Sequence, residues 1–160
     1  AVADMRDFAT TESLTDRFDV ITSLFTSFGY FTEWADQIRT LQQVRRALRS
    51  GGTFVLDFLN TPYVAAHLVP HEIAHRPTPE GGSMTFEIHR RFEAGWIEKS
   101  IAYTDDQGQD KHYVERVRAL SSEALESLLA EADLTVRQRF GDYGLGAHSE
   151  ASNRCILVAS

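Results

Sequence analysis

The stretch FDVITSLF at residues 18–25 is followed by an amphipathic segment at residues 36–48 and by TFVLDF at residues 53–58. The outer two segments are apolar runs of strand length, bounded by polar or glycine residues. The middle segment repeats its apolar residues every three or four positions, at Ile38, Leu41, Val44 and Leu48. A strand, a helix and a second strand in this order form a βαβ unit with parallel strands. The sequence therefore predicts an α/β fold, in which ligands bind at the carboxyl ends of the strands.

The rest of the chain is expected to complete this α/β fold, with one inserted antiparallel sheet. We expect the helix to end at Gly51, because glycine favours the left-handed C-terminal cap. All four prolines lie within residues 61–83, which predicts an irregular crossing segment. Three antiparallel strands are then expected at about 84–93, 95–104 and 111–118. A helix capped by Ser121 and two further strands close the chain. The expected sheet has strands at about 18–25, 53–59, 134–140 and 153–159, and the expected inserted sheet spans about 84–118.

Composition excludes several classes of protein. The formal net charge of −7 argues against nucleic acid, which is bound by clustered Lys and Arg. No apolar run approaches the ~20 residues that span a bilayer, and no charged-then-apolar leader is visible. Cys155 is the single cysteine, inside an apolar run, which predicts a buried thiol in a reducing compartment. We therefore expect a cytoplasmic protein that contacts neither membrane nor nucleic acid.

Three motifs carry a resemblance to a known family. They are DMRDF at residues 4–8, FDVI at 18–21 leading to Gly29-Tyr30, and LRSGGTF at 48–54. In this order and spacing they resemble class I S-adenosylmethionine-dependent methyltransferases. The chain is similar to glycine N-methyltransferase and to the amino-sugar N,N-dimethyltransferases, which also insert an antiparallel sheet after the fifth strand. The resemblance implies S-adenosylmethionine as cofactor and a small-molecule methyl acceptor, with an amine as the accepting group.

The resemblance also implies a missing portion. In the family, a glycine-rich loop after the first strand holds the methionine part of the cofactor, and an acidic residue ending the second strand binds the ribose. Neither lies in this sequence, because Gly141 to Gly146 precedes a strand rather than opening a helix. We therefore expect the C-terminal portion of a Rossmann-like methyltransferase. Its partial core would comprise residues 1–60 and 119–160, and residues 61–118 would supply a linker and a sheet that covers the substrate.

The family pattern assigns cofactor contacts to five positions. It places Asp4 and Met5 beside the adenine, and Ser23, Leu24 and Phe25 around the sulfonium. Other readings stay open, because Asp is common at strand-end turns and Leu24 is equally suited to core packing.

The acceptor side falls in two loops. Thr26 and Tyr30 occupy positions that face the methyl acceptor in the family, and they are the expected catalytic residues. Asn60 and Tyr63 match the family pattern around the acceptor pocket, although Asn60 and Pro62 would equally form a turn. Methyl transfer is an in-line displacement, so positioning supplies most of the rate enhancement. An amine acceptor loses a proton, which Tyr30 or a water would take.

Two alternative functions remain. Without the first two strands of the family fold, the strand at residues 18–25 would be an edge, which invites pairing with another chain. The chain would then be a non-catalytic binding module or form a homodimer. A metal site built from His67, His71 and His75 with Glu72 would need a continuous helix, which Pro70 breaks. We therefore expect no metal at these histidines.

Overall fold

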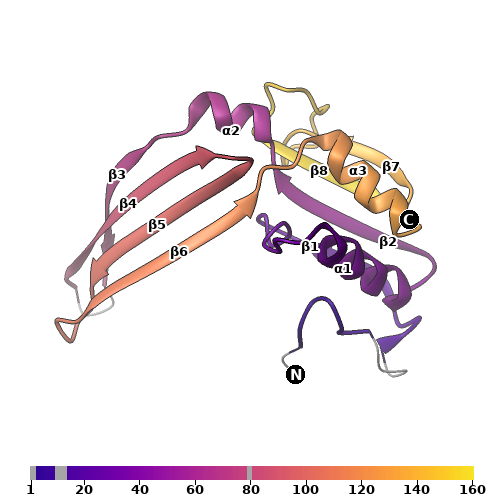
Figure 1. Cartoon of the computed structure of the whole chain (residues 1–160), viewed down its shortest axis with the longest axis horizontal. Helices are drawn as coiled ribbons and strands as arrows, with labels where there is room; N and C mark the ends of the chain where they lie inside the picture. Colours follow the sequence, from indigo (N-terminus) through magenta and orange to yellow (C-terminus); the bar gives the residue numbers. More distant parts are fainter. Residues whose placement is uncertain (1–2, 10–13, 79–80) are drawn as a thin grey trace. The chain divides into compact units, whose positions relative to one another are not determined.

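The computed structural model describes residues 3–9, 14–78 and 81–160, which form two compact units (Figure 1). The first unit comprises residues 1–64 and 120–160, and the second comprises residues 65–119. The first contains β1 (Phe18–Ser23), α1 (Trp34–Ala47), β2 (Leu48–Leu59), α3 (Ser122–Glu131), β7 (Val136–Phe140) and β8 (Arg154–Ala159). The second contains β3 (His71–Pro77), β4 (Ser83–Glu93), β5 (Trp96–Thr104) and β6 (Asp110–Arg118), and α2 (Thr61–His67) spans the boundary along the chain.

The sheet of the first unit has the strand order β1-β2-β8-β7. Strands β1 and β2 are parallel, with Ile21 opposite Phe54 and Ser23 opposite Leu56. Strand β8 is antiparallel to both of its neighbours, β2 and β7. The expected α/β fold is confirmed, and the reversed strand β8 lies between two strands that run in a common direction.

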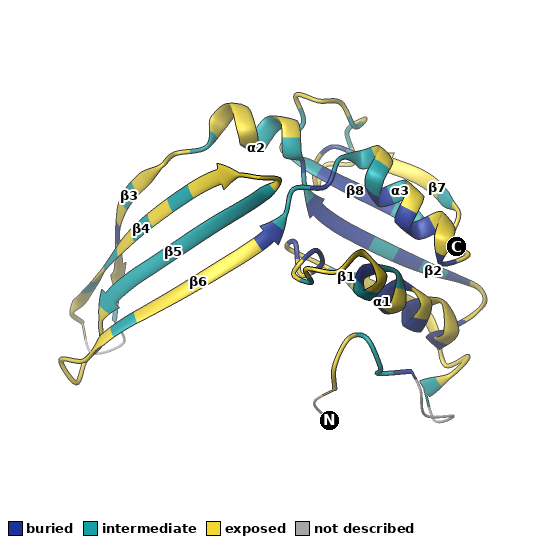
Figure 2. Cartoon of the chain, in the orientation of Figure 1, coloured by how far each residue is buried: buried dark blue, intermediate teal, exposed yellow. Residues whose placement is uncertain are grey.

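Apolar side chains from one face of the sheet and from two helices form the core of this unit. Phe54, Leu56 and Phe58 alternate along β2 and are at most 1% exposed. Helices α1 and α3 pack beside one another against this sheet, and strands β2 and β8 are largely buried (Figure 2). The largest fully buried side chains of the two helices include Leu41, Leu125, Leu128 and Leu129. Helix α3 begins as predicted, because the Ser121 side chain accepts a hydrogen bond from the Ala124 N–H at 3.2 Å.

The end of α1 differs from the prediction. The helix stops at Ala47, and Leu48 is already extended and opposite Phe18 in the sheet. Gly51 does not cap the helix. It lies with φ of 74° at the start of β2, where the register to β1 shifts between Phe18 and Val20. The left-handed glycine that the sequence assigned to a helix cap is needed instead for an irregularity in the strand.

Strand β1 is an edge of the sheet among the described residues. Val20 is 57% exposed and Phe18 is 39% exposed, whereas the central strand β2 is buried over most of its length. The strand ends at Ser23, two residues before the predicted limit, because Phe25 and Thr26 have positive φ angles. No helix in the described part of the chain is long and apolar enough to cross a membrane.

The second unit is an antiparallel sheet of order β3-β4-β5-β6. The expected strands at about 84–93, 95–104 and 111–118 correspond to β4, β5 and β6. The prediction of only three strands is wrong, because β3 pairs along its whole length with β4, from His71 opposite His89 to Pro77 opposite Ser83. The predicted irregular segment at residues 61–83 thus contains a helix and a strand.

The prolines near β3 are compatible with its position. Pro70 precedes the strand and Pro77 ends it, and the strand lies at the edge of the sheet. An edge strand tolerates proline because one row of its N–H groups has no ladder partner. Pro70 and Pro77 therefore lie at the two ends of a strand, and they do not indicate an irregular loop.

Candidate functional site

The parallel strands β1 and β2 end at the same edge of the first unit's sheet. Beyond β1 lies the segment of residues 24–33, and beyond β2 lies Asn60. This is the edge at which open α/β sheets bind ligands. Seven of the nine residues predicted from the sequence follow or end these two strands: Ser23, Leu24, Phe25, Thr26, Tyr30, Asn60 and Tyr63.

The segment after β1 begins with an unusual backbone. Phe25 and Thr26 both lie in the left-handed region, with φ of 55° and 61°. Such a conformation costs a non-glycine residue about 1–3 kcal/mol, so surrounding contacts must hold it. It leaves Leu24 42% exposed and Phe25 76% exposed, while Thr26 is buried. Two large apolar side chains are thereby presented to solvent at the ligand edge of the sheet.

Asp57 supplies the contacts that hold this segment. Its side chain is 1% exposed, near the C-terminal end of β2. The N–H of Phe25 donates to Oδ2 at 2.8 Å, and the N–H of Thr26 donates to the Asp57 carbonyl at 3.0 Å. Arg154 of β8 donates from Nε to Oδ1 at 2.7 Å and from Nη2 to the Thr26 hydroxyl at 3.2 Å. One buried ion pair thus fixes the backbone of the predicted cofactor and catalytic residues.

Tyr143 completes this network from the loop between β7 and β8. Its hydroxyl donates to Asp57 Oδ2 at 2.9 Å. Desolvation, and then the hydrogen bond to the Asp57 carboxylate, raise the pKa of Tyr143 above its ordinary value. Its ring also contacts that of Phe25 edge to face, with centroids 6.5 Å apart. Phe25 is therefore positioned through both its backbone and its ring.

A small cavity of about 150 Å³ lies between β1, α1 and the segment of residues 5–8. Met5, Ser23 and Ser27 contribute to its wall, together with the buried rings of Phe28 and Phe54. The hydroxyls of Ser23 and Ser27 are 3.0 Å apart and share a hydrogen bond. The structure thus brings two of the predicted cofactor residues, Met5 and Ser23, to one apolar cavity with a polar rim.

Asp4 is paired within its own turn. The Arg6 side chain donates from Nε to Oδ1 at 3.0 Å and from Nη2 to Oδ2 at 2.7 Å, and the Arg6 N–H donates to Oδ1 at 2.9 Å. Arg6 also reaches Asp36 of α1 at 3.1 Å and lies over the Phe31 ring, 4.7 Å from its centroid. Arg6 therefore ties the Asp4–Phe8 segment to the beginning of α1.

The Asp4 pair predicts a measurable titration. The side-chain and backbone hydrogen bonds from Arg6 lower the pKa of Asp4 from its ordinary value of 3.8 to about 2. Because the folded pKa is depressed, the pair stabilises the fold above the ordinary pKa, and this is lost as pH falls toward about 2. Carbon-detected NMR of the carboxyl should show a midpoint near 2, and Arg6→Gln should return it toward 3.8. An unchanged midpoint in the variant would contradict the assignment of Arg6 as its cause.

The acceptor-side candidates have different environments. Tyr30 is 46% exposed in the segment after β1. Asn60 is 3% exposed, and its side-chain amide donates to the carbonyls of Ser149, Glu150 and Ser152 at 2.9, 3.1 and 2.6 Å. Its amide nitrogen therefore holds the loop before β8. Tyr63 is half-buried in α2.

Cys155 is not part of this site. It lies in β8, is 2% exposed and forms no disulfide. Burial raises the pKa of its thiol to about 11. A thiol of this kind stays protonated at neutral pH and is a poor nucleophile, as the apolar sequence around it predicted.

Comparison with known proteins gives structural matches only. No protein-family model and no curated protein matches the sequence. A solved S-adenosylmethionine-dependent methyltransferase from Clostridium acetobutylicum matches with a TM-score of 0.79 and 18% identity, over 100% of this chain and 63% of that one. The sugar N-methyltransferase KedS8 from a Streptoalloteichus species matches with a TM-score of 0.75 and 22% identity, over 98% and 60%. CalS10, an amino pentose methyltransferase from Micromonospora echinaspora, matches with a TM-score of 0.66 and 19% identity, over 98% and 62%.

These matches extend over both units, including the antiparallel sheet of β3 to β6. Since each covers this chain almost completely, the chain spans about three fifths of the length of the structures it matches. The 160 residues therefore have the fold of the corresponding part of S-adenosylmethionine-dependent methyltransferases.

Proposed function

We propose that this chain is the acceptor-side portion of an S-adenosylmethionine-dependent methyltransferase that methylates a small-molecule amine. The observation that carries the proposal is the carboxyl edge of β1 and β2. There, buried Asp57 holds Phe25 and Thr26 in left-handed conformations and leaves Leu24 and Phe25 exposed. A strained backbone supported by a buried ion pair is typical of functional sites.

The residues present fit one end of the cofactor. The cavity wall combines the apolar side chains of Met5 and Phe28 with the hydroxyls of Ser23 and Ser27. Such a wall suits the flat, weakly polar adenine, with Leu24 and Phe25 beside the sulfonium. When bound, the cofactor supplies an electrophilic methyl group. The glycine-rich loop and the acidic ribose ligand of the family are not in this sequence, so we assign no contacts to the methionine and ribose portions.

Asp4 has two competing partners in this proposal. Its carboxylate accepts from Arg6, yet the family pattern has it accept from the adenine amino group. A carboxylate has about four lone-pair sites, so it can accept from both. The Arg6 pair would then hold the carboxylate in place for the adenine amino group.

Four residues of this chain are assigned to positioning the segment after β1 and to binding the acceptor. The Thr26 hydroxyl is buried against Arg154, so we assign Thr26 a positioning role for the segment after β1. Tyr30 is an exposed tyrosine in that segment, and we assign it to the acceptor, where its hydroxyl would accept a hydrogen bond from the neutral amine and orient it. The proton released after methyl transfer would pass to water. Asn60 would shape the acceptor side by fixing the loop at residues 149–152. Tyr63 is proposed to contact the acceptor directly.

The amine acceptor is supported by the matched structures. KedS8 is described as a sugar N-methyltransferase and CalS10 as an amino pentose methyltransferase. Neutral amines need no strong base for attack on a sulfonium, only alignment within the near-attack distance, which is worth about 7–11 kcal/mol. This agrees with a candidate site that offers hydroxyls and apolar surface.

The test is methyl transfer by the natural gene product that carries these 160 residues. With methyl-labelled S-adenosylmethionine and a panel of amino sugars, we expect label in the amine product. Tyr30→Phe should lower kcat by about 100-fold, the loss that misplacement of a reacting group produces. The KM for the cofactor should change little, since Tyr30 is assigned to the acceptor.

Thr135→Val provides a matched control, because it also deletes a single hydroxyl. Thr135 precedes β7, which runs in the same direction as β2, so it lies at the opposite edge of the sheet. Its kcat should stay within about 2-fold of the parent. Transfer that is unaffected by Tyr30→Phe would remove Tyr30 from the site, and the absence of both transfer and cofactor binding would overturn the proposal.

One observation favours a second candidate, a binding or dimerisation module. Strand β1 is an edge with exposed Phe18 and Val20, and exposed apolar edges pair with other chains. This reading predicts a homodimer in solution and no methyl transfer. The labelled-cofactor experiment separates it from the methyltransferase, because only the enzyme yields labelled amine.

A further inference from the structure

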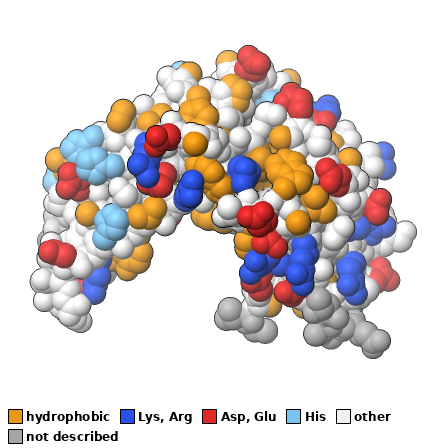
Figure 3. All heavy atoms as spheres, in the orientation of Figure 1, with side chains coloured by type: hydrophobic (Ala, Val, Ile, Leu, Met, Phe, Trp, Pro, Cys, Tyr) orange, Lys and Arg blue, Asp and Glu red, His pale blue; other side chains and the backbone are white. Residues whose placement is uncertain are grey.

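Histidine side chains gather on the polar face of the second unit's sheet, where they are pale blue in Figure 3. His71 of β3 lies directly opposite His89 of β4 in the ladder. Glu87 precedes His89 by two residues on β4, so its side chain projects from the same face. The backbone register therefore brings two imidazoles and one carboxylate together from two adjacent strands.

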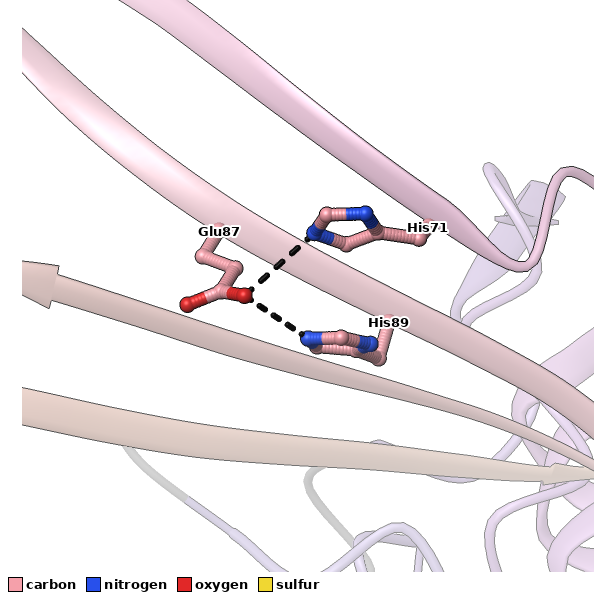
Figure 4. Close-up of side chains that lie close together, drawn as sticks. All are labelled: His71, Glu87 and His89. Carbon is pink, nitrogen blue, oxygen red and sulfur yellow. Dashed lines mark hydrogen bonds and ion pairs between the residues drawn. The ribbon is translucent and has the colours of Figure 1, made fainter.

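The side chains converge on one carboxylate oxygen (Figure 4). The Nε2 atoms of His71 and His89 lie 3.3 and 3.1 Å from Glu87 Oε1. The two rings are stacked, with centroids 4.5 Å apart and planes inclined by 20°. The three candidate ligand atoms all lie within 4.8 Å of one another. Both imidazoles thus present the same nitrogen to the same point.

We propose that His71, Glu87 and His89 form a binding site for a zinc ion. Zinc takes nitrogen and oxygen ligands at about 2.0–2.2 Å in tetrahedral geometry. The edge of such a tetrahedron is about 3.3–3.5 Å. The two nitrogen–oxygen separations of 3.3 and 3.1 Å are already close to this length. Zinc would replace the protons that now link the imidazoles to the carboxylate, and small side-chain rotations would close the nitrogen–nitrogen distance.

The charges around the three side chains suit a cation. Glu87 contributes a carboxylate oxygen, one of the ligand types that zinc takes in proteins. The two arginines that follow His89 on β4 are both paired: Arg90 with Glu72 at 2.8 Å, and Arg91 with Glu98 at 2.8 Å. About half of each ligand side chain is exposed, 49% for His71 and 56% for Glu87 and His89. Water can therefore supply the fourth ligand.

Metal binding would join the edge strand β3 to β4. His71 lies at the first residue of β3, just after Pro70, where the strand begins. A ligand from each strand fixes their register, and any ion that binds only the folded chain stabilises it by mass action. The site lies outside the proposed methyl-transfer residues, so it stands or falls independently of the proposed function.

Calorimetric titration of the metal-stripped chain with zinc chloride tests the proposal. We expect one zinc per chain, a rise in Tm on zinc addition, and a visible absorption band typical of tetrahedral cobalt when Co²⁺ is used instead. His89→Ala and Glu87→Gln should each weaken zinc binding by at least about 10-fold. Magnesium chloride should not bind, because Mg²⁺ prefers octahedral oxygen ligands.

His75→Ala is the matched control. His75 lies on the same face of the same edge strand, but its Nδ1 is hydrogen-bonded to the Thr85 hydroxyl at 3.0 Å. The zinc affinity of the His75→Ala variant should stay within about 2-fold of that of the parent chain. Circular dichroism of each variant should match that of the parent, because the substituted residues are exposed. Absence of zinc binding, retention of binding in His89→Ala, or an equal loss in His75→Ala would each overturn the proposal.

Discussion

Asp57→Ala is expected to destabilise the chain by about 3–5 kcal/mol, because it leaves the Arg154 guanidinium partly buried without its counter-charge. The side chains of Asp57 and Arg154 are 1% and 19% exposed, with Oδ1 and Nη2 2.6 Å apart. The same change removes acceptors from the Phe25 N–H and the Tyr143 hydroxyl. Urea unfolding followed by circular dichroism measures the free-energy change.

The double variant Asp57→Ala/Arg154→Met is the control for this prediction. Removing both charges avoids the unpaired buried cation, so it should recover part of the loss and show a coupling energy of about 0.5–3 kcal/mol. Hydrogen exchange of the Phe25 amide should be faster in both variants, because both lose the Asp57 carboxylate that accepts its N–H. The Thr26 amide should change less, because its acceptor is the backbone carbonyl of residue 57. A loss below about 1 kcal/mol in Asp57→Ala would show that Arg154 is solvated without its partner.

The βαβ unit could be predicted because its signals are local. The periodic apolar residues of the middle segment predicted a helix, and Leu41 and Val44 lie on the buried face of α1 beside the polar side chains of Gln37, Thr40 and Gln43. The apolar runs on either side define β1 and β2. The same holds for the polar and apolar alternation of β4, with Glu87 and His89 on one face. Periodicity needs no knowledge of the partner segment, which is why these elements were found.

Strand β3 could not be found in this way. Its seven residues, HEIAHRP, include three charged or proline residues and no clean alternation. Its strand conformation depends on pairing with β4, for which the sequence of β3 alone gives no signal. Proline normally argues against a strand, and only the position at the sheet edge removes that objection.

The sequence predicted which strand ends meet, but it did not predict the side-chain contacts between them. The carboxyl ends of β1 and β2 were correctly expected to meet, because both strands are parallel. Asp57 was overlooked, although a lone acidic residue inside an apolar strand is itself a signal that a partner exists. Its partner, Arg154, is 97 residues further along the chain and enters through the reversed strand β8. Only the tertiary fold reveals that pair.

The histidine cluster illustrates the same limit. A metal set of His67, His71 and His75 would have needed one continuous helix and was not expected from the sequence, whereas the structure places His71 and His75 on a strand. The residue that joins His71 is its cross-strand neighbour His89, 18 positions later. Strand register, which sequence periodicity does not fix, decides which histidines meet.

Phe54→Ala should cost about 3–5 kcal/mol, since Phe54 is 1% exposed in the centre of the core. Its ring also lines the cavity of about 150 Å³ beside Met5 and Phe28, so the deleted volume would merge with space that is already empty. A site that cannot collapse falls at the costly end of this range. Val20→Ala is the control: Val20 is 57% exposed on the edge strand β1, so the change in stability should be less than about 0.5 kcal/mol. If urea unfolding gave the two variants similar losses, the cavity wall would be a loosely packed surface, and the assignment of the adenine to it would lose its physical basis.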